Sequence, residues 1–167
     1  KPFLKWVGGK YKLLDKTLQY LPQEINNYHE VFLGGGSVLL AILSLQKANK
    51  IQINGNIYAY DLNSSLINCF KQVKTNPQLV INHLKKIIAE FTQITVNTLG
   101  QRGAPEDYAT NHTRSREHYY YWMRKRFNVS SKTGVEAACN FIFLNKTGFR
   151  GMYRESAEGD FNIPYGY

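Results

Sequence analysis

Patterns of metal ligands and disulfides are missing from this sequence. Cys69 and Cys139 are its two cysteines, they lack Cys-x-x-Cys spacing, and the four histidines show no metal-ligand spacing. We therefore expect two reduced thiols in a reducing compartment and no metal site. No segment has the apolar length of a membrane span, and the first residues lack the charged and apolar regions of a signal peptide. These absences favour a cytoplasmic or nucleoid-associated protein with no membrane partner.

Acidic residues are scarce relative to basic ones. Lys and Arg total 21 against 12 Asp and Glu, which gives a net charge of +9 and a pI near 9.5. Such an excess favours a polyanionic partner, with nucleic acid ahead of an anionic membrane surface, although a merely soluble basic protein stays open. The 167 residues suit one domain, or a domain with a small insertion. Because the chain begins at Lys1, we expect processing or a longer natural protein.

The first half of the chain repeats a strand–turn–helix pattern. This repetition is typical of α/β architecture with parallel strands. Asn63 or Ser64 is expected to cap the helix that follows the second strand. The predicted helices span about 10–20, 38–48 and 77–91, and the predicted strands span 28–33 and 56–61.

The second half of the chain has a different pattern. Residues 92–113 are polar and contain Gly100, Gly103 and Pro105, which predicts a long mobile loop. Helices are predicted over about 115–127 and 132–146. The tail from residue 148 alternates aromatic and polar side chains, and it predicts a β-hairpin that turns at 158–160.

A glycine-rich turn connects the first predicted strand to a helix. Gly34, Gly35, Gly36 and Ser37 allow a ligand to approach the backbone and the free N–H groups of a helix N-terminus. Asp61 ends the next strand, where a carboxylate can accept both hydroxyls of a ribose. This layout indicates a nucleoside cofactor but does not separate a nicotinamide dinucleotide from S-adenosylmethionine. A tight turn with Asp61 as a helix cap is the simpler alternative.

Two stricter nucleotide-binding patterns are not met. The dinucleotide pattern Gly-x-Gly-x-x-Gly requires a third glycine where Ser37 or Leu39 stands. The run VGGK at 7–10 is not a phosphate-binding loop, because Leu4 stands at its first glycine position and Tyr11 at the position of the magnesium-binding Ser or Thr. A nucleoside triphosphatase is therefore excluded.

Four segments of the chain form an ordered set: PFLKWVGGK (2–10), EVFLGGGSVLL (30–40), YAYDLNSSLI (59–68) and FLNKTGFRGMYR…GDFNIPYG (143–166). Together they resemble the Dam-type (D12 class) adenine-N6 DNA methyltransferases. Val31 stands where this family usually has Pro, a change that the turn should tolerate. The closing run FNIPYGY is similar to the second strand of the family's DNA-reading hairpin, not to its catalytic tetrapeptide Asp-Pro-Pro-Tyr.

The resemblance implies a fold and a state of the protein. It implies a partial Rossmann-like, S-adenosylmethionine-dependent methyltransferase core over 1–91, and an inserted, mostly helical DNA-recognition subdomain over 92–167 that ends in a β-hairpin. No Asp-Pro-Pro-Tyr is present, so we expect an N-terminal portion that is inactive by itself. A longer chain or a second chain would complete the exposed sheet edge. A catalytically dead binding relic and, less favoured, an NAD-dependent oxidoreductase are the alternatives.

The same resemblance implies partners and site residues. Double-stranded DNA is the expected substrate, and a cognate restriction endonuclease is a further candidate partner. Core packing is the alternative role for Trp6. The implied cofactor-binding residues are Trp6, Lys10, Phe32, Gly34, Gly35, Gly36, Ser37 and Asp61.

The implied DNA-binding residues fall into three groups. Arginines of the 115–127 helix would contact phosphates, although a solvated helix face explains their charge equally well. Arg150 and Arg154 would read guanine through a bidentate fork, Phe149 would wedge into the base stack, and the others would contact bases. Because the Dam proteins usually have Asn where Arg150 stands, a palindrome such as CATG is nearly as well supported as GATC. The DNA-binding set is Lys5, Arg124, Arg126, Phe149, Arg150, Met152, Arg154 and Pro164.

Overall fold

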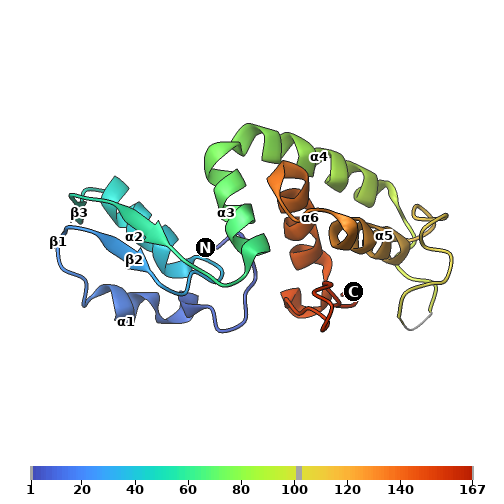
Figure 1. Ribbon diagram of the computed structural model, residues 1–167, viewed down its shortest axis with the longest axis horizontal. Helices are drawn as coiled ribbons and strands as arrows, with labels where there is room; N and C mark the ends of the chain where they lie inside the picture. The colour runs from blue at the N-terminus through green and yellow to red at the C-terminus, as the bar shows by residue number, and fades with distance from the viewer. Residues whose placement is uncertain (1, 101–102, 167) are drawn as a thin grey trace. The chain divides into compact units, whose positions relative to one another are not determined.

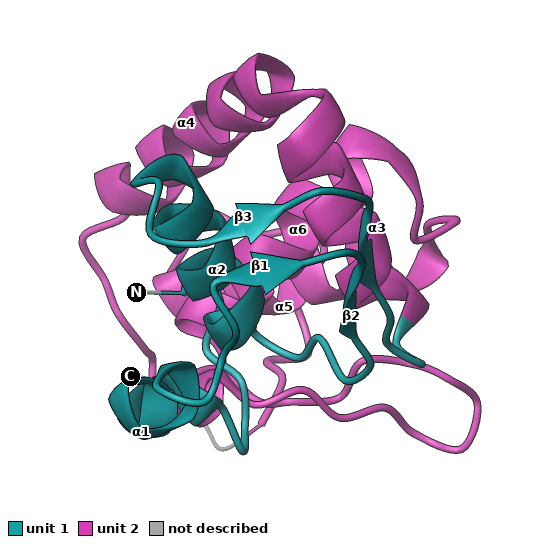
Figure 2. Ribbon diagram, turned by 90° about the vertical axis from the view of Figure 1, so that its left-hand side faces the viewer, with its two compact units in different colours: residues 1–63 teal, residues 64–167 magenta. Residues whose placement is uncertain are grey.

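The computed structural model describes residues 2–100 and 103–166, so residues 101 and 102 of the predicted loop and Tyr167 of the predicted hairpin lie outside it. The chain divides into two compact units, residues 1–63 and 64–167 (Figures 1 and 2). Each unit is described by itself.

Unit 1 combines short helices with short parallel strands. Strand β1 pairs with β3 and β2 pairs with β4, both in parallel. The parallel pairing predicted from the strand–turn–helix pattern is thereby confirmed. The elements of the unit are η1 (Lys10–Leu13), α1 (Leu14–Leu18), β1 (Glu24–Ile25), β2 (Tyr28–Glu30), α2 (Ser37–Lys47), β3 (Gln52–Ile53) and β4 (Ile57–Ala59).

A bulge separates the two strand pairs. Glu24 is opposite Gln52, whereas Tyr28 is opposite Ile57. The stretch that joins β3 to β4 therefore contains one more residue than the stretch that joins β1 to β2. Gly55 lies at this place, and a Cβ there would come within 2.4 Å of the Asn26 carbonyl oxygen. Glycine is therefore required by close backbone approach.

Unit 2 is a helical unit built around a buried helix. It contains α3 (Ser64–Thr75), α4 (Pro77–Gln93), α5 (Arg116–Val129), α6 (Gly134–Thr147) and η2 (Phe149–Gly151). Helix α6 packs against α3, α4 and α5, and all its residues from Ala137 to Asn145 are buried. Its first turns contain the small residues Ala137, Ala138 and Cys139, and these allow close packing. Phe91, Tyr119 and Phe143 form an aromatic cluster between α4, α5 and α6, in which Phe143 packs edge-to-face with the other two rings.

The helices and strands predicted with residue ranges are confirmed in position, and three of them have different bounds. The helix predicted over 10–20 is a 3₁₀ turn followed by the short α1, so it ends at Leu18. The strand predicted over 28–33 ends at Glu30, because the backbone bends from Val31 onward into the glycine turn. The strand predicted over 56–61 spans only Ile57–Ala59.

The tail does not form the regular hairpin that the sequence predicts. It folds back in the antiparallel sense through isolated bridges that join Gly148 to Tyr165 and Glu155 to Phe161, and the reversal lies between Ser156 and Asp160. Both backbone groups of Phe161 are bonded to the side chain of Asn128, and the described tail residues form no continuous ladder.

The stretch 92–113, predicted as a loop, has no regular secondary structure among its described residues beyond Gln93, where α4 ends, and hydrogen bonds attach it to α5. Between Gln93 and Arg116 the described residues form turns and no helix or strand. Backbone N–H groups of Arg116 and Glu117 donate to the carbonyls of Val96 and Asn97. His118, which is fully buried, contacts Asp107 through Nε2 at 2.8 Å. None of the helices in the described ranges is both long and apolar enough to cross a membrane.

The predicted functional boundary at residues 91 and 92 differs from the division into compact units. The units divide after Asn63, because α3 and α4 pack on α6. The division into compact units does not show which residues bind a cofactor, so the functional boundary stays a prediction.

Candidate functional site: the glycine-turn cavity and the tail

The glycine turn follows β2 and leads into α2. Gly34 has φ +47° and Gly36 has φ +72°, values that disfavour other residues. A Cβ at Gly34 would lie 3.0 Å from Cδ1 of Trp6, so the indole packs directly against the turn. Gly36 precedes the first residue of α2, which leaves the N–H groups of that helix's first turn near the cavity.

Asp61 holds the glycine turn in place. It follows β4, and its Oδ2 accepts a hydrogen bond of 2.9 Å from the Gly34 N–H, while its Oδ1 accepts one of 3.0 Å from the Asn63 N–H. The tight turn of the simpler alternative is present, but the bond to Asn63 precedes α3 (Ser64–Thr75) and is not a cap of its first turn. Each carboxylate oxygen can accept a second hydrogen bond, so the group keeps acceptor capacity.

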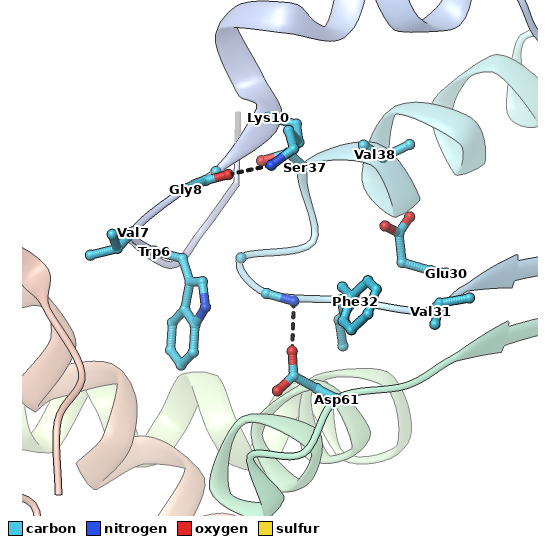
Figure 3. A pocket seen from close by; sticks show the side chains of 14 residues that line it. Trp6, Val7, Gly8, Lys10, Glu30, Val31, Phe32, Ser37, Val38 and Asp61 are labelled. Atoms are coloured by element: carbon cyan, nitrogen blue, oxygen red, sulfur yellow. Dashed lines mark hydrogen bonds between the residues drawn. The ribbon is translucent and has the colours of Figure 1, made fainter.

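A cavity of about 580 Å³ opens between the turn and the N-terminal segment (Figure 3). Seven of the eight predicted cofactor residues line it, and the eighth, Gly36, lies in the turn without lining it. Lys10 donates from Nζ to the Gly8 carbonyl at 3.0 Å. Phe32 is 86% exposed, so its ring is available to a ligand. The lining residues are Trp6, Val7, Gly8, Gly9, Lys10, Glu30, Val31, Phe32, Leu33, Gly34, Gly35, Ser37, Val38 and Asp61.

Sequence reasoning missed Glu30 in this cavity. Glu30 ends β2 and accepts a short hydrogen bond from the Tyr28 hydroxyl. Burial, together with this bond and the nearby carboxylate charge, raises the pKa of Tyr28. The position of Glu30 just before the predicted glycine turn was the available signal.

The segment 161–165 is held rigidly on unit 2. Phe161, Ile163 and Tyr165 are 3%, 1% and 7% exposed, whereas Asn162 is half-buried and Pro164 is exposed. This alternation presents Asn162 and Pro164 away from the core.

Helix α5 supplies the bonds that fix this segment. Asn128 pairs with both backbone groups of Phe161, accepting from its N–H at 2.9 Å and donating to its carbonyl at 3.0 Å. The Tyr120 hydroxyl and Arg124 Nη1 both donate to the Ile163 carbonyl, at 2.9 and 3.1 Å.

The predicted base-reading residues share the tail. Phe149 is 42% exposed, and the Arg150 guanidinium lies over its ring at 5.1 Å. Arg150 has φ +55°, a left-handed conformation that is unfavourable for a residue with a Cβ. Arg154 is exposed and donates from Nε to Oδ1 of Asn162 at 2.7 Å. Met152 is half-buried.

The two arginines predicted to contact phosphates, Arg124 and Arg126, have partners within unit 2. Arg124 is engaged by Ile163 and lies over the Tyr121 ring. Arg126 pairs with Glu136 and lies over the Trp122 ring. The two ring contacts are three and four residues apart on α5, a spacing that helical periodicity indicates. It could not reveal Ile163 or Glu136, because these partners lie outside α5. Lys5 is exposed and belongs to unit 1, unlike the other predicted DNA contacts.

Comparison with known proteins defines the class of this α/β chain. Residues 6–167 match the family described as D12 class N6 adenine-specific DNA methyltransferase. The chain belongs to this family.

Similar curated proteins carry matching names. The Type II methyltransferase M.MjaIII of Methanocaldococcus jannaschii is 34% identical over 99% of this chain and 52% of its own length. The DNA adenine methylases of Haemophilus influenzae and Escherichia coli K12 are 33% and 29% identical over 99% of this chain, and 47% and 48% of theirs. The chain therefore spans about half the length of these relatives. Membership implies a methyl donor and excludes the NAD-dependent oxidoreductase as a reading of the glycine turn.

Proposed function

We propose that the complete protein is a site-specific DNA adenine-N6 methyltransferase that uses S-adenosylmethionine, and that this chain supplies its cofactor cavity and its target-recognition surface. The observation that carries this proposal is the cavity of about 580 Å³ that the glycine turn, the N-terminal segment and Asp61 line, in a member of the adenine methyltransferase family. The parallel strand pairs would begin a Rossmann-like sheet, and the folded-back tail would act as the DNA-reading hairpin. Partial coverage of the relatives supports completion by further residues or a second chain.

The donor groups of the cavity fit S-adenosylmethionine. Asp61 would accept the ribose hydroxyls with its remaining lone pairs, and the Lys10 ammonium would pair with the methionine carboxylate. The exposed Phe32 ring offers an apolar surface to the adenine of the cofactor. Trp6 would support the turn from behind, because Gly34 packs directly on its indole. Gly35, Gly36 and Ser37 would leave room for the cofactor beside the backbone.

The reaction requires more than this chain contains. The bound cofactor would supply an activated methyl group. The amino nitrogen of adenine is a weak nucleophile because its lone pair is delocalised into the ring, and the target base must leave the duplex to be reached. The family resemblance assigns orientation of this amino group to an Asp-Pro-Pro-Tyr motif, which is absent from residues 1–167. We infer that this motif lies in the remaining part of the enzyme.

Duplex DNA would be read by the tail. Arg150 and Arg154 would face guanine edges, Met152 and Pro164 would make apolar contacts, and Phe149 would enter the base stack. Lys5 would reach the outer base pair. Arg124 and Arg126 would add positive charge near phosphates while their guanidinium groups retain internal partners. A cognate endonuclease fits the Type II names of relatives such as M.MjaIII.

Binding and turnover test the proposal in the full-length protein. Calorimetry with S-adenosylhomocysteine should show that Asp61→Ala lowers affinity at least roughly tenfold, since charge-assisted bonds and the support of Gly34 are lost together. Asp15→Ala, on the exposed face of α1, is the matched control and should bind normally. Unchanged affinity in Asp61→Ala would end the cofactor assignment.

A second measurement separates an active enzyme from a binding relic. The full-length protein should convert adenine in duplex DNA to N6-methyladenine with S-adenosylmethionine, detected by mass spectrometry of digested nucleosides. Binding of both ligands without this product identifies a relic.

A further inference from the structure

One donor of the Arg154 guanidinium, the Nε–H, already has a hydrogen-bond partner within the tail. Its Nε–H donates to Oδ1 of Asn162 at 2.7 Å, and the backbone N–H of Asn162 donates to the Arg154 carbonyl at 3.1 Å. The two residues are therefore paired through side chain and backbone across the fold-back of the tail.

Asn162 is itself held from both sides. The backbone of Phe161 is paired with Asn128, and the Ile163 carbonyl accepts from Tyr120 and Arg124. Because this acceptor is fixed, it restricts the rotamers of the exposed Arg154 side chain before DNA binds. Less side-chain conformational entropy is then lost on binding.

We propose that Asn162 is a positioning residue for target recognition: it orients Arg154 so that Nη1 and Nη2 form an end-on fork for one guanine. This inference rests on the proposed function. With Nε occupied, the two terminal NH₂ groups are the donors left for O6 and N7. Asn162 acts through Arg154 and makes no base contact of its own.

The test uses the full-length enzyme and a determined target. Sequencing of methylated plasmid DNA first identifies the target. Methylation rates are then compared on duplexes that each differ from it by one base pair, so discrimination is measured position by position.

Asn162→Ala should lower discrimination roughly tenfold at a single base pair, because an unanchored guanidinium tolerates other bases. Arg154→Ala should lower discrimination at that same base pair. The double variant should match Arg154→Ala alone, since the two residues act as a unit. Asn162→Asp keeps an oxygen acceptor and should retain discrimination, although its charge weakens binding to all duplexes.

The controls distinguish positioning from folding. Asn82→Ala, on α4, also removes a side-chain acceptor, the one to which Gln78 donates. This variant should leave discrimination unchanged at every base-pair position. Where Asn162→Ala does not fold, Asn162→Ser replaces it, because the shorter hydroxyl does not reach Nε.

Three results would overturn the proposal. Discrimination could be unchanged in Asn162→Ala, it could fall equally at every position, or Asn162→Asp could lose it as Asn162→Ala does. The last result would show that the amide NH₂ itself contacts DNA. Failure of the unmodified enzyme to methylate adenine would instead refute the proposed function.

Discussion

Two buried asparagines on α6 differ in hydrogen bonding. Asn145 is 3% exposed and donates from Nδ2 to the Gly151 carbonyl at 3.1 Å. Asn140 is 1% exposed, and neither its Oδ1 nor its Nδ2 bonds to any described residue. A buried amide without partners has lost its hydration without compensation, so Asn140 destabilises the folded unit.

Replacing Asn140 should therefore stabilise the protein. Asn140→Leu keeps the branching at Cγ, removes the unpaired polar atoms and suits a helix interior, so the free energy of unfolding should rise by about 1–2 kcal/mol. Urea denaturation followed by circular dichroism measures the change. Asn145→Leu is the matched control, and it should destabilise because the Gly151 carbonyl loses its donor. A loss of stability in Asn140→Leu would show that the amide has partners in solution.

Asp107 predicts an acid-dependent loss of stability. Hydrogen bonds from His118 first, and then from Asn111 and Arg114, lower the pKa of Asp107 from 3.8 to about 2. A depressed folded-state pKa stabilises the folded state above the unfolded-state pKa, and this contribution is lost as the pH falls toward 2.

The variant Asp107→Asn isolates this contribution. The stability advantage of the unmodified protein over Asp107→Asn should be full near neutral pH and should shrink as the pH falls below 3.8 toward about 2. Denaturant titrations at several pH values measure it. An advantage that stays constant across this range would contradict the role of the charge.

At the scale of elements, helix α5 has two roles. Its buried side packs on α6, and its polar side chains fasten the segment 161–165. The segment lacks a regular strand partner. Side chains of α5 bond the backbone groups of Phe161 and the Ile163 carbonyl, while the Asn162 N–H and the Pro164 carbonyl pair with the backbone of the tail. The precision of the tail therefore depends on α5 as well as on isolated backbone bonds.

Asn128→Ala should release this fastening. Both backbone groups of the buried Phe161 would lose their partners, which should cost about 1–3 kcal/mol of unfolding free energy. Hydrogen exchange should show faster exchange of the Phe161 amide. Asn128→Asp keeps the acceptor for that amide, so its exchange should remain slow. Equal exchange in Asn128→Ala and the unmodified protein would show that other groups hold the segment.

Element positions were largely predictable from the sequence, and their exact ends were less so. Helical periodicity located α4 and α6 to within a few residues because their apolar faces are long. The two-residue strands β1 and β3 escaped notice, because so short a run carries no alternation. The cavity was found through Gly34 and Asp61, whose residue types are demanded by backbone geometry.

Side-chain partners could not be foreseen in the same way. The bonds from Arg124 to Ile163 and from Arg154 to Asn162 join residues that are far apart in sequence or meet only after the tail folds back. Periodicity reports which face of a helix is apolar, but it does not identify the acceptor that a charged side chain finds. Periodicity likewise did not show that Glu30 lines the cavity.

At the scale of the whole molecule, the hydrophobic core and the charge are unevenly distributed. Among the described residues, twenty buried apolar side chains lie in 64–167, and four lie in 1–63: Leu4, Leu33, Leu39 and Ile42. Residues 64–167 also carry 14 Lys and Arg against 8 Asp and Glu, a net +6 of the total +9. A core of this size can support independent folding, whereas a small unit with few buried side chains cannot.

Separate expression of the two units should therefore give different results. Residues 64–167 should show helical circular dichroism and a cooperative thermal transition, because α6 keeps its contacts with α3, α4 and α5. Residues 1–63 should show no cooperative transition, since burial of four apolar side chains does not offset the entropy of ordering the unit. Matched concentrations and a reducing buffer keep the comparison fair, because Cys69 and Cys139 both lie in 64–167. A cooperative transition in 1–63 alone would show that the parallel strand pairs and the packing of Trp6 on the glycine turn suffice to fold the cofactor cavity.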